Sequence, residues 1–208
     1  MKLAVFDFDS TLMDGETIDM IADECGIKEE VSKITEKAMR GEMDFFESLT
    51  TRVSLLKGLD YSKVEKICKN VPLMNGAKET VKGLKKAGFT VICFSGGFKS
   101  ATSPAGKYLG IDADFSNILH HRNGLLTGQV GGEMMFNSSK GEMLTRLQNI
   151  LHITPKETLA VGDGANDLSM FAFAETRVAF CAKEILKKEA TMVIDEKDLT
   201  KILDNLNL

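Results

Sequence analysis

The sequence has few cysteines, no long apolar run and no surplus of positive charge, and each absence excludes a class of protein. The four cysteines, Cys25, Cys68, Cys93 and Cys181, are far apart in the 208 residues and form no metal-binding pair, which favours reduced thiols in a cytoplasmic protein. No apolar run approaches the roughly 20 residues of a membrane span, and Asp7 comes too early for a signal peptide. The net charge of −4 argues against nucleic acid as the main partner.

The apolar residues that are present form short continuous runs with the length of buried strands. Such runs, unlike alternating ones, are typical of parallel strands covered on both faces. Segments with helical spacing lie between them, for example Met143, Leu147 and Ile150. This alternation predicts an α/β fold with a Rossmann-like open parallel sheet. The expected strands are 3–6, 89–94, 159–161, 178–180 and 192–194.

One long region interrupts this alternation. From residue 12 to residue 72 the apolar positions have helical spacing only, in stripes around Ile21, Leu49 and Val64. We interpret 12–72 as a helical cap inserted into a core made of 1–11 and 73–208. A second stretch, 116–130, is irregular but contains Asn123-Gly124, a strong turn signal, and predicts a small β-hairpin flap.

Polar clusters follow three of the expected strands. Residues 7–11 read DFDST, residues 95–97 read SGG, and residues 162–167 read GDGAND. Ligands of open α/β sheets bind beyond the carboxyl ends of the strands. We therefore expect the three clusters to converge on one crevice, although each alone is compatible with an ordinary turn.

Four of the clustered residues are carboxylates: Asp7, Asp9, Asp163 and Asp167. Two like charges about 4 Å apart repel by about 1 to 4 kcal/mol, depending on the effective dielectric constant. Several of them must therefore be protonated, or a cation must lie among them. Because no histidine or cysteine is nearby, the oxygen ligands favour a hard ion, and Mg²⁺ best fits them.

The sequence also offers groups that would bind an anion. The segment Ser95-Gly96-Gly97 could bind a phosphate through its main-chain N–H groups. The alternative is that it forms an ordinary turn between a strand and a helix. Residues 139–142 (SKGE) fit a capping box, which places Lys140 in the first turn of a helix. The helix dipole disfavours a cation there unless an anion lies close by, so phosphate contact competes with a solvated surface lysine.

Two charged residues of the predicted cap have an unusual setting. Arg52 shares an apolar helix face with Phe45 and Leu49, so its guanidinium needs a carboxylate or phosphate partner. Glu16 lies in the expected first turn of a helix, where it would at least stabilise the helix dipole. Together, opposite charges at two places could bind the two ends of a zwitterion.

Taken together, these motifs resemble the haloacid dehalogenase superfamily over nearly the whole chain. DFDST at 7–11, Ser95, Lys140 and GDGAND at 162–167 match its four motifs in order. Within the superfamily the sequence is most similar to the phosphoserine phosphatases. The residues that carry this narrower resemblance are SGGF at 95–98, AMRG at 38–41, LGID at 109–112, Phe45, Arg52 and Met170.

The resemblance implies a role for each acidic residue of the site. Asp7 would be the nucleophile that forms an aspartyl-phosphate, and Asp9 would protonate the leaving oxygen and then activate water. Asp7, Asp163 and the main-chain carbonyl of Asp9 would hold Mg²⁺, with Asp167 and Asn166 supporting the site. The expected reaction is Mg²⁺-dependent hydrolysis of O-phospho-L-serine, as used in L-serine biosynthesis.

The resemblance also implies how the substrate would bind. Ser95, Gly96 and Lys140 would contact the phosphoryl oxygens, Glu16 the ammonium and Arg52 the carboxylate. The pocket would be shaped by Phe45, Met39 and Gly97. Two alternatives stay open: phosphoryl chemistry on another small phosphorylated amino acid or alcohol, such as phosphohomoserine, and a phosphate-binding module without turnover.

Overall fold

The fold is organised around one seven-stranded sheet with the order β4-β3-β2-β1-β5-β6-β7. The computed structural model describes residues 2–39 and 42–208. All neighbouring strands are parallel except β3 and β4, so the predicted α/β class with an open parallel sheet is confirmed. The strands are β1 (Lys2–Asp7), β2 (Phe89–Phe98), β3 (Ala113–Arg122), β4 (Leu125–Gly132), β5 (Thr158–Gly162), β6 (Thr176–Phe180) and β7 (Met192–Ile194).

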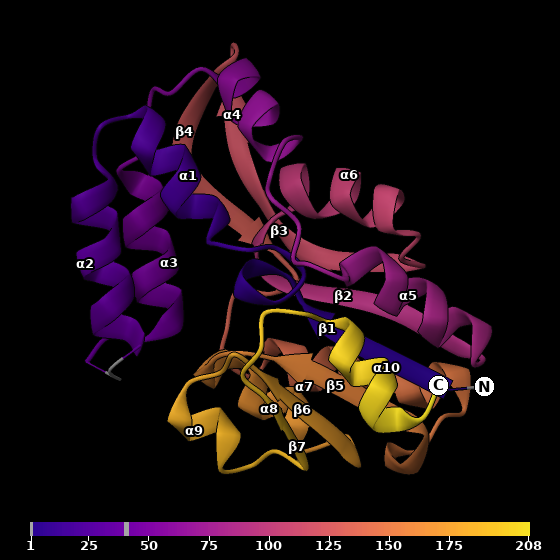
Figure 1. Cartoon of the computed structure of the whole chain (residues 1–208). Helices are drawn as coiled ribbons and strands as arrows, with labels where there is room; N and C mark the ends of the chain where they lie inside the picture. The colour runs from indigo at the N-terminus through magenta and orange to yellow at the C-terminus, as the bar shows by residue number, and fades with distance from the viewer. Residues whose placement is uncertain (1, 40–41) are drawn as a thin grey trace.

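Helices cover both faces of this sheet, which explains the continuous apolar runs. Consecutive strand side chains point to opposite faces. Ala4 and Phe6 accordingly pack in one apolar cluster and Leu3 and Val5 in another. The first cluster includes α5 (Ala77–Lys86), α6 (Lys99–Leu109) and α10 (Thr200–Leu206); the second includes α7 (Ser139–Leu151), α8 (Leu168–Phe171) and α9 (Glu184–Lys187) (Figure 1).

Among the described residues between β1 and α5, four α-helices lie away from the centre of the sheet (Figure 1). They are α1 (Thr17–Glu24), α2 (Lys28–Met39), α3 (Phe45–Ser54) and α4 (Tyr61–Cys68). The chain enters and leaves this helical segment at the same place. Met13 and Leu73 form an antiparallel bridge, and the Met74 N–H donates to the Leu12 carbonyl at 2.9 Å.

The predicted hairpin is present, but it extends the main sheet. Asn123 and Gly124 form its turn with φ values of 53° and 78°, as a two-residue turn of this kind requires. The stretch 116–130 interrupts the alternation of strands and helices, as expected. The first half of β3 pairs with β2, and only its second half pairs with β4. The hairpin also contacts the helical segment, where the Tyr61 N–H donates to the Gly124 carbonyl at 2.8 Å.

Two further observations concern the cysteines and the membrane. All four cysteines are free thiols, and burial raises the pKa of Cys68 and Cys93, which makes these two thiols less reactive. Within residues 2–39 and 42–208, no helix combines the length and the apolar character that crossing a membrane requires.

The packing of α5 against the sheet gives a test of the core. Leu84 on this helix is fully buried, so Leu84→Ala should leave a cavity and lower the free energy of unfolding by about 2–5 kcal/mol. Urea unfolding followed by circular dichroism measures this loss. Ile150 on α7 is 71% exposed, and Ile150→Ala should change the same quantity by less than about 0.5 kcal/mol. Equal losses for the two variants would contradict this packing.

Candidate active site

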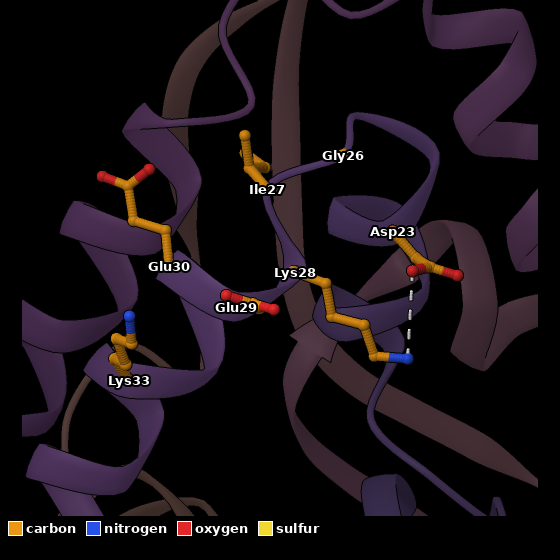
Figure 2. Close-up of a pocket in the computed structure, with 7 residues that line it drawn as sticks. All are labelled: Asp23, Gly26, Ile27, Lys28, Glu29, Glu30 and Lys33. Carbon is orange, nitrogen blue, oxygen red and sulfur yellow. Dashed lines mark ion pairs between the residues drawn. The ribbon is translucent and has the colours of Figure 1, made fainter.

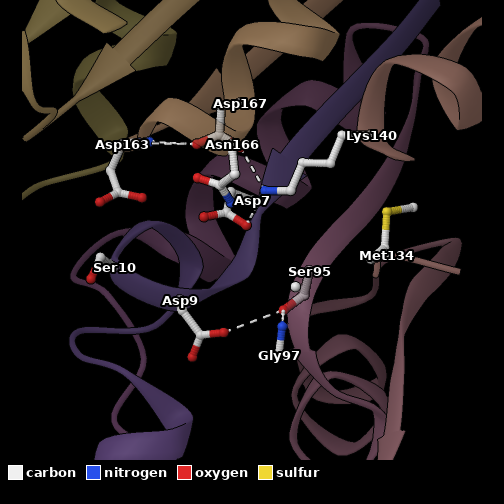
Figure 3. Close-up of polar contacts among 12 residues, drawn as sticks. Asp7, Asp9, Ser10, Ser95, Gly97, Met134, Lys140, Asp163, Asn166 and Asp167 are labelled. Carbon is white, nitrogen blue, oxygen red and sulfur yellow. Dashed lines mark hydrogen bonds and ion pairs between the residues drawn. The ribbon is translucent and has the colours of Figure 1, made fainter. Parts of the chain in front are cut away.

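Three buried carboxylates meet where two neighbouring strands end. Asp7 is the last residue of β1, and Asp163 directly follows β5, which pairs with β1 in parallel. Asp167 ends the short 3-10 turn that comes next. One oxygen from each carboxylate lies within 4.8 Å of the other two (Figure 3). The sheet therefore brings together two of the polar clusters that are about 155 residues apart in the sequence.

The fourth carboxylate, Asp9, does not join this group. It lies in the wide helical turn Phe8–Leu12 that follows β1. One of its oxygens accepts hydrogen bonds from the Thr17 N–H (2.7 Å) and the Thr17 hydroxyl (2.6 Å), and the other accepts from the Ser95 hydroxyl at 3.3 Å (Figure 3). The expectation that four carboxylates face one cation is therefore corrected, because the Asp9 side chain points toward α1 and β2.

Lys140 lies between two of the three carboxylates. Its Nζ donates to Asp7 Oδ1 and to Asp167 Oδ1, both at 2.5 Å, and all three side chains are buried. Burial disfavours the charge on Lys140, but Asp167 and Asp7 outweigh this effect and raise its pKa. The predicted position in the first helical turn is confirmed, and carboxylates of the chain itself supply the anion that the helix dipole calls for.

The capping box predicted at this helix is absent. The helix begins at Ser139, Ser138 is its N-cap, and neither the Ser138 nor the Glu142 side chain makes a capping bond. Instead, the Ser139 hydroxyl accepts a hydrogen bond from the Phe136 N–H at 3.1 Å, and the Ser139 N–H donates to the Phe136 carbonyl at 3.0 Å. The first turn is therefore fixed to the preceding loop rather than capped on itself.

The electrostatics of the three carboxylates fit a bound cation. Burial raises the pKa of Asp7 to about 7, although Lys140 acts against this effect. Burial also raises the pKa of Asp163, and the neighbouring Asp7 and Asp167 raise it further. In the described part of the chain, no donor lies within hydrogen-bond distance of the Asp163 carboxylate oxygens. Three carboxylates with one lysine leave an excess of negative charge, and their oxygens suit a hard divalent ion.

The SGG cluster forms a bulge within β2 rather than the turn expected after it. The strand continues to Phe98, and its pairing with β3 shifts between Ser95 and Phe98. The Gly97 N–H donates to the Ser95 hydroxyl at 2.9 Å. A Cβ atom on Gly97 would lie 2.4 Å from an Asp9 carboxylate oxygen, and one on Gly96 would lie 2.7 Å from the Phe45 ring. A side chain at either position would therefore displace the end of a neighbouring side chain, the Asp9 carboxylate at Gly97 and the Phe45 ring at Gly96.

A cavity of about 670 Å³ connects the carboxylates with the helical segment. Arg52 on α3 lines its far end, where its Nε donates to the Ser48 carbonyl and its Nη1 to the Thr35 hydroxyl, both at 3.2 Å. Arg52 forms no ion pair with the described residues. The described residues therefore do not supply the carboxylate partner that the sequence led us to expect for the Arg52 guanidinium.

Glu16 lines the same cavity at the start of α1. Its carboxyl accepts a hydrogen bond from the Ser10 hydroxyl at 2.7 Å. Burial, and to a lesser extent Asp9, raises the pKa of Glu16 to about 8. Asn166 also lines the cavity, whereas Met39 is the last residue of α2 and its side chain lies outside the described residues.

The sequence analysis missed two residues of the site. Thr17 binds the Asp9 carboxylate through both its N–H and its hydroxyl; its signal was a threonine in the first turn of a predicted helix. Asn117 binds Gly96 and the loop before α7; its signal was an asparagine within an apolar stretch, a residue type that is depleted in strands.

A second hollow lies over the turn between α1 and α2 (Figure 2). Asp23 and Lys28 form an exposed ion pair of 4.0 Å there, and the hollow contains none of the residues singled out from the sequence. Exposed pairs of this kind contribute little energy. The cavity at the strand ends is therefore the candidate active site.

Comparisons with known proteins agree on one family. A family model described as haloacid dehalogenase-like hydrolase matches residues 1–175. The phosphoserine phosphatase of Wolinella succinogenes is 63% identical over 206 residues, which cover 99% of this chain and 100% of that protein. The phosphoserine phosphatase of Methanocaldococcus jannaschii is 50% identical over 202 residues, which cover 97% of this chain and 96% of that protein.

Solved structures give the same result. A phospho-aspartyl intermediate analogue of phosphoserine phosphatase has a TM-score of 0.94 and 50% identity, covering 98% of each chain. A substrate-bound phosphoserine phosphatase complex also has a TM-score of 0.94, with 49% identity over 98% of this chain and 97% of that one.

The carboxylate cluster predicts a measurable response to divalent cations. Mg²⁺ should raise the Tm of the wild-type protein when a chelator sets the concentration of free Mg²⁺, because the ion binds the folded state. Asp163→Asn should remove most of this rise. In the absence of metal, the same variant should melt at a higher temperature than the wild type, because one repelling buried charge is gone.

The control for this experiment is Asp195→Asn, which removes an exposed carboxylate that pairs with Lys187 at 2.7 Å. It should keep the full response to Mg²⁺. An Asp163→Asn protein that responds to Mg²⁺ as the wild type does would show that this cluster is not the cation site.

Proposed function

This chain belongs to the haloacid dehalogenase-like hydrolases, and on that premise we propose that it hydrolyses O-phospho-L-serine to L-serine and phosphate. The observation that carries the proposal is the cavity itself. Asp7 lies at one end of it, and Glu16 and Arg52 offer charges opposite to those of the ammonium and carboxylate of phosphoserine. The reaction belongs to L-serine biosynthesis, and the free cysteines support a cytoplasmic location.

The first chemical step uses Asp7 as the nucleophile. A carboxylate oxygen of Asp7 forms a bond to phosphorus while the bond between phosphorus and the serine oxygen breaks, which leaves an aspartyl-phosphate. Asp9 donates its proton to the departing serine oxygen. Burial raises the pKa of Asp9, which helps it to carry that proton. Thr17 fixes the direction of the Asp9 carboxyl through two hydrogen bonds.

The second step hydrolyses the aspartyl-phosphate. Asp9, now ionised, accepts a proton from water as the water oxygen attacks phosphorus, and Asp7 is released as a carboxylate. Lys140 stays bonded to Asp7 Oδ1 and holds the nucleophile in one orientation. Asp167 fixes Lys140 from the other side and accepts hydrogen bonds from the Asp163 and Gly164 N–H groups at 3.0 and 3.1 Å.

The chain's own oxygens would hold the metal ion. We propose Mg²⁺, bound by the carboxylates of Asp7 and Asp163 and by the main-chain carbonyl of Asp9. When bound, the ion supplies positive charge that offsets the charge of the phosphoryl oxygens and of Asp7. Ser95, Gly96 and Lys140 complete the proposed phosphoryl site, and Asn166 supports the loop that presents Asp163.

The helical segment 12–72 would serve as a cap over the core formed by 1–11 and 73–208. Glu16 would bind the substrate ammonium and Arg52 its carboxylate, and Phe45 and Gly97, which line the same cavity, would shape it. The rings of Phe46 on α3 and Phe136 before α7 stack with their centres 5.2 Å apart, which connects the cap to the core. A covered site excludes water other than the reacting molecule.

The role of Arg52 predicts selective damage. Arg52→Ala should lower kcat/KM for phosphoserine by about 10- to 100-fold, because a charge-assisted hydrogen bond contributes about 1.5–3 kcal/mol. It should change kcat/KM for 4-nitrophenyl phosphate by less than about threefold, since that ester has no carboxylate. Phosphate release from phosphoserine, phosphohomoserine and 4-nitrophenyl phosphate, with Mg²⁺ supplied, provides the measurement.

Asp7→Asn is the companion variant in this assay and should abolish turnover of all three esters while the protein stays folded. A wild-type protein that shows no preference for phosphoserine, together with an Arg52→Ala loss that is equal on every ester, would overturn the substrate assignment. Phosphate binding without any turnover by the wild type would instead indicate a binding module.

The raised pKa of Glu16 predicts a dependence on pH. Below a pKa of about 8 the carboxyl is protonated and neutral, and above it the carboxylate can pair with the substrate ammonium. The ratio of kcat/KM for phosphoserine to that for 4-nitrophenyl phosphate should therefore rise from pH 6 through about pH 8, where half of the Glu16 carboxyl groups are ionised, and level off only about one pH unit above that pKa. Taking the ratio cancels the titration of Asp7, which affects both esters. Glu16→Gln should give a lower ratio that does not change with pH, and an unchanged rise in that variant would exclude this role.

A further inference from the structure

We infer that Asn117 is a positioning residue that fixes the two phosphoryl-binding elements, the β2 bulge and the start of α7, at a set distance from each other. The inference rests on the proposed phosphoryl transfer at Asp7, but not on the identity of the group that leaves. Asn117 lies on β3 where the partner strand changes from β2 to β4, so it is close to both elements.

The three hydrogen bonds of the Asn117 side-chain amide all go to main-chain groups. Its Nδ2 donates to the carbonyls of Gly96 and Met134, both at 3.0 Å, and its Oδ1 accepts from the Met134 N–H at 3.0 Å. The residue is fully buried. A buried amide that pairs with three main-chain groups links those groups rigidly, because breaking any bond leaves an unsatisfied polar atom.

On one side, Asn117 fixes the bulge of β2. The Gly96–Gly97 peptide is held at both ends, since its carbonyl accepts from Asn117 and its N–H donates to the Ser95 hydroxyl. The Ser95 hydroxyl in turn donates to Asp9 at 3.3 Å. The orientation of this peptide therefore determines where the Ser95 hydroxyl points, and Asn117 determines the orientation of the peptide.

On the other side, Asn117 fixes the approach to Lys140. Met134, which it binds through both main-chain groups, lies in the short loop between β4 and α7 (Figure 3). Two residues later, Phe136 exchanges two hydrogen bonds with Ser139, the residue before Lys140. In Figure 3 the labelled Met134 lies on the same side of the site as Ser95 and Lys140.

β4 passes close to the Asn117 side chain. A Cβ atom on Gly132, its partner on β4, would lie 2.7 Å from the Asn117 Cα and 2.8 Å from its Oδ1. β4 therefore approaches closely enough to hold the amide in place. Loss of the amide should let the bulge and the α7 start shift apart, and a displacement of about 1 Å in a reacting site can cost about 100-fold in rate.

The experiment compares Asn117→Ala, Asn117→Asp and Asn117→Ser with the wild type. Asn117→Asp keeps an acceptor for the Met134 N–H, but it replaces the Nδ2 donor by an oxygen that faces the carbonyls of Gly96 and Met134. Asn117→Ser retains a single hydroxyl donor. We expect kcat/KM to fall about 100-fold in the Ala and Asp variants and less in the Ser variant. The loss should be equal for phosphoserine and 4-nitrophenyl phosphate, and inhibition by inorganic phosphate should weaken in parallel.

Gln148→Ala is the matched control. Gln148 is a buried amide on the same helix as Lys140, and its Nε2 donates to the Thr158 hydroxyl and the Phe173 carbonyl, both at 2.8 Å. Its loss should lower the Tm to a similar degree but leave kcat/KM within about threefold of the wild type when assayed below that Tm.

Three outcomes would overturn the inference: Asn117 variants with a native circular dichroism spectrum and near-normal kcat/KM, a loss no larger than that of Gln148→Ala, or a loss confined to phosphoserine. The 4-nitrophenyl phosphate assay separates this test from the proposed function. A wild-type protein that hydrolyses 4-nitrophenyl phosphate but not phosphoserine would refute the substrate and leave the role of Asn117 open to the same measurement.

Discussion

The ion pairs of the buried Lys140 with Asp7 and Asp167 are the interaction on which the rest of the site depends. Charges are costly to bury unless they are paired and hydrogen-bonded, and Lys140 makes it possible for two carboxylates to remain at the strand ends. The third carboxylate, Asp163, exceeds what one lysine can balance. The same arrangement thus orients Asp7, the proposed nucleophile, and leaves an excess of negative charge that suits a divalent cation.

The site divides its tasks between two kinds of structure. The phosphoryl group would be held by two rigid elements, the β2 bulge and the first turn of α7, which hydrogen bonds through Asn117 on β3 and the loop before α7 connect. The charges that suit the rest of the substrate come from Glu16 and Arg52 in the helical segment. Thr17 connects the two parts, because this first residue of α1 holds the carboxyl of Asp9.

Much of this arrangement could be predicted from the sequence, because it depends on local patterns. Continuous apolar runs located the parallel strands, and polar clusters at their ends located Asp7 and Asp163. What could not be predicted depends on the partners of a residue in three dimensions. The direction of the Asp9 carboxyl follows from its hydrogen bonds to Thr17 and Ser95, and the extension of β2 through Ser95 and the pairing of β3 with two strands follow from sheet register. The residue roles and the cap boundaries remain predictions.

The bridge between Met13 and Leu73 has a consequence for the evolution of the fold. The chain leaves the sheet at Met13 and returns to it at Leu73, and these two residues lie side by side. The ends of the inserted segment therefore stay the same short distance apart whatever helices lie between them. Closing a longer loop costs only about 0.6 kcal/mol for each doubling of its length. Helices can therefore be exchanged, lengthened or lost at this point while the strand order stays the same, so that one catalytic sheet can acquire new substrates.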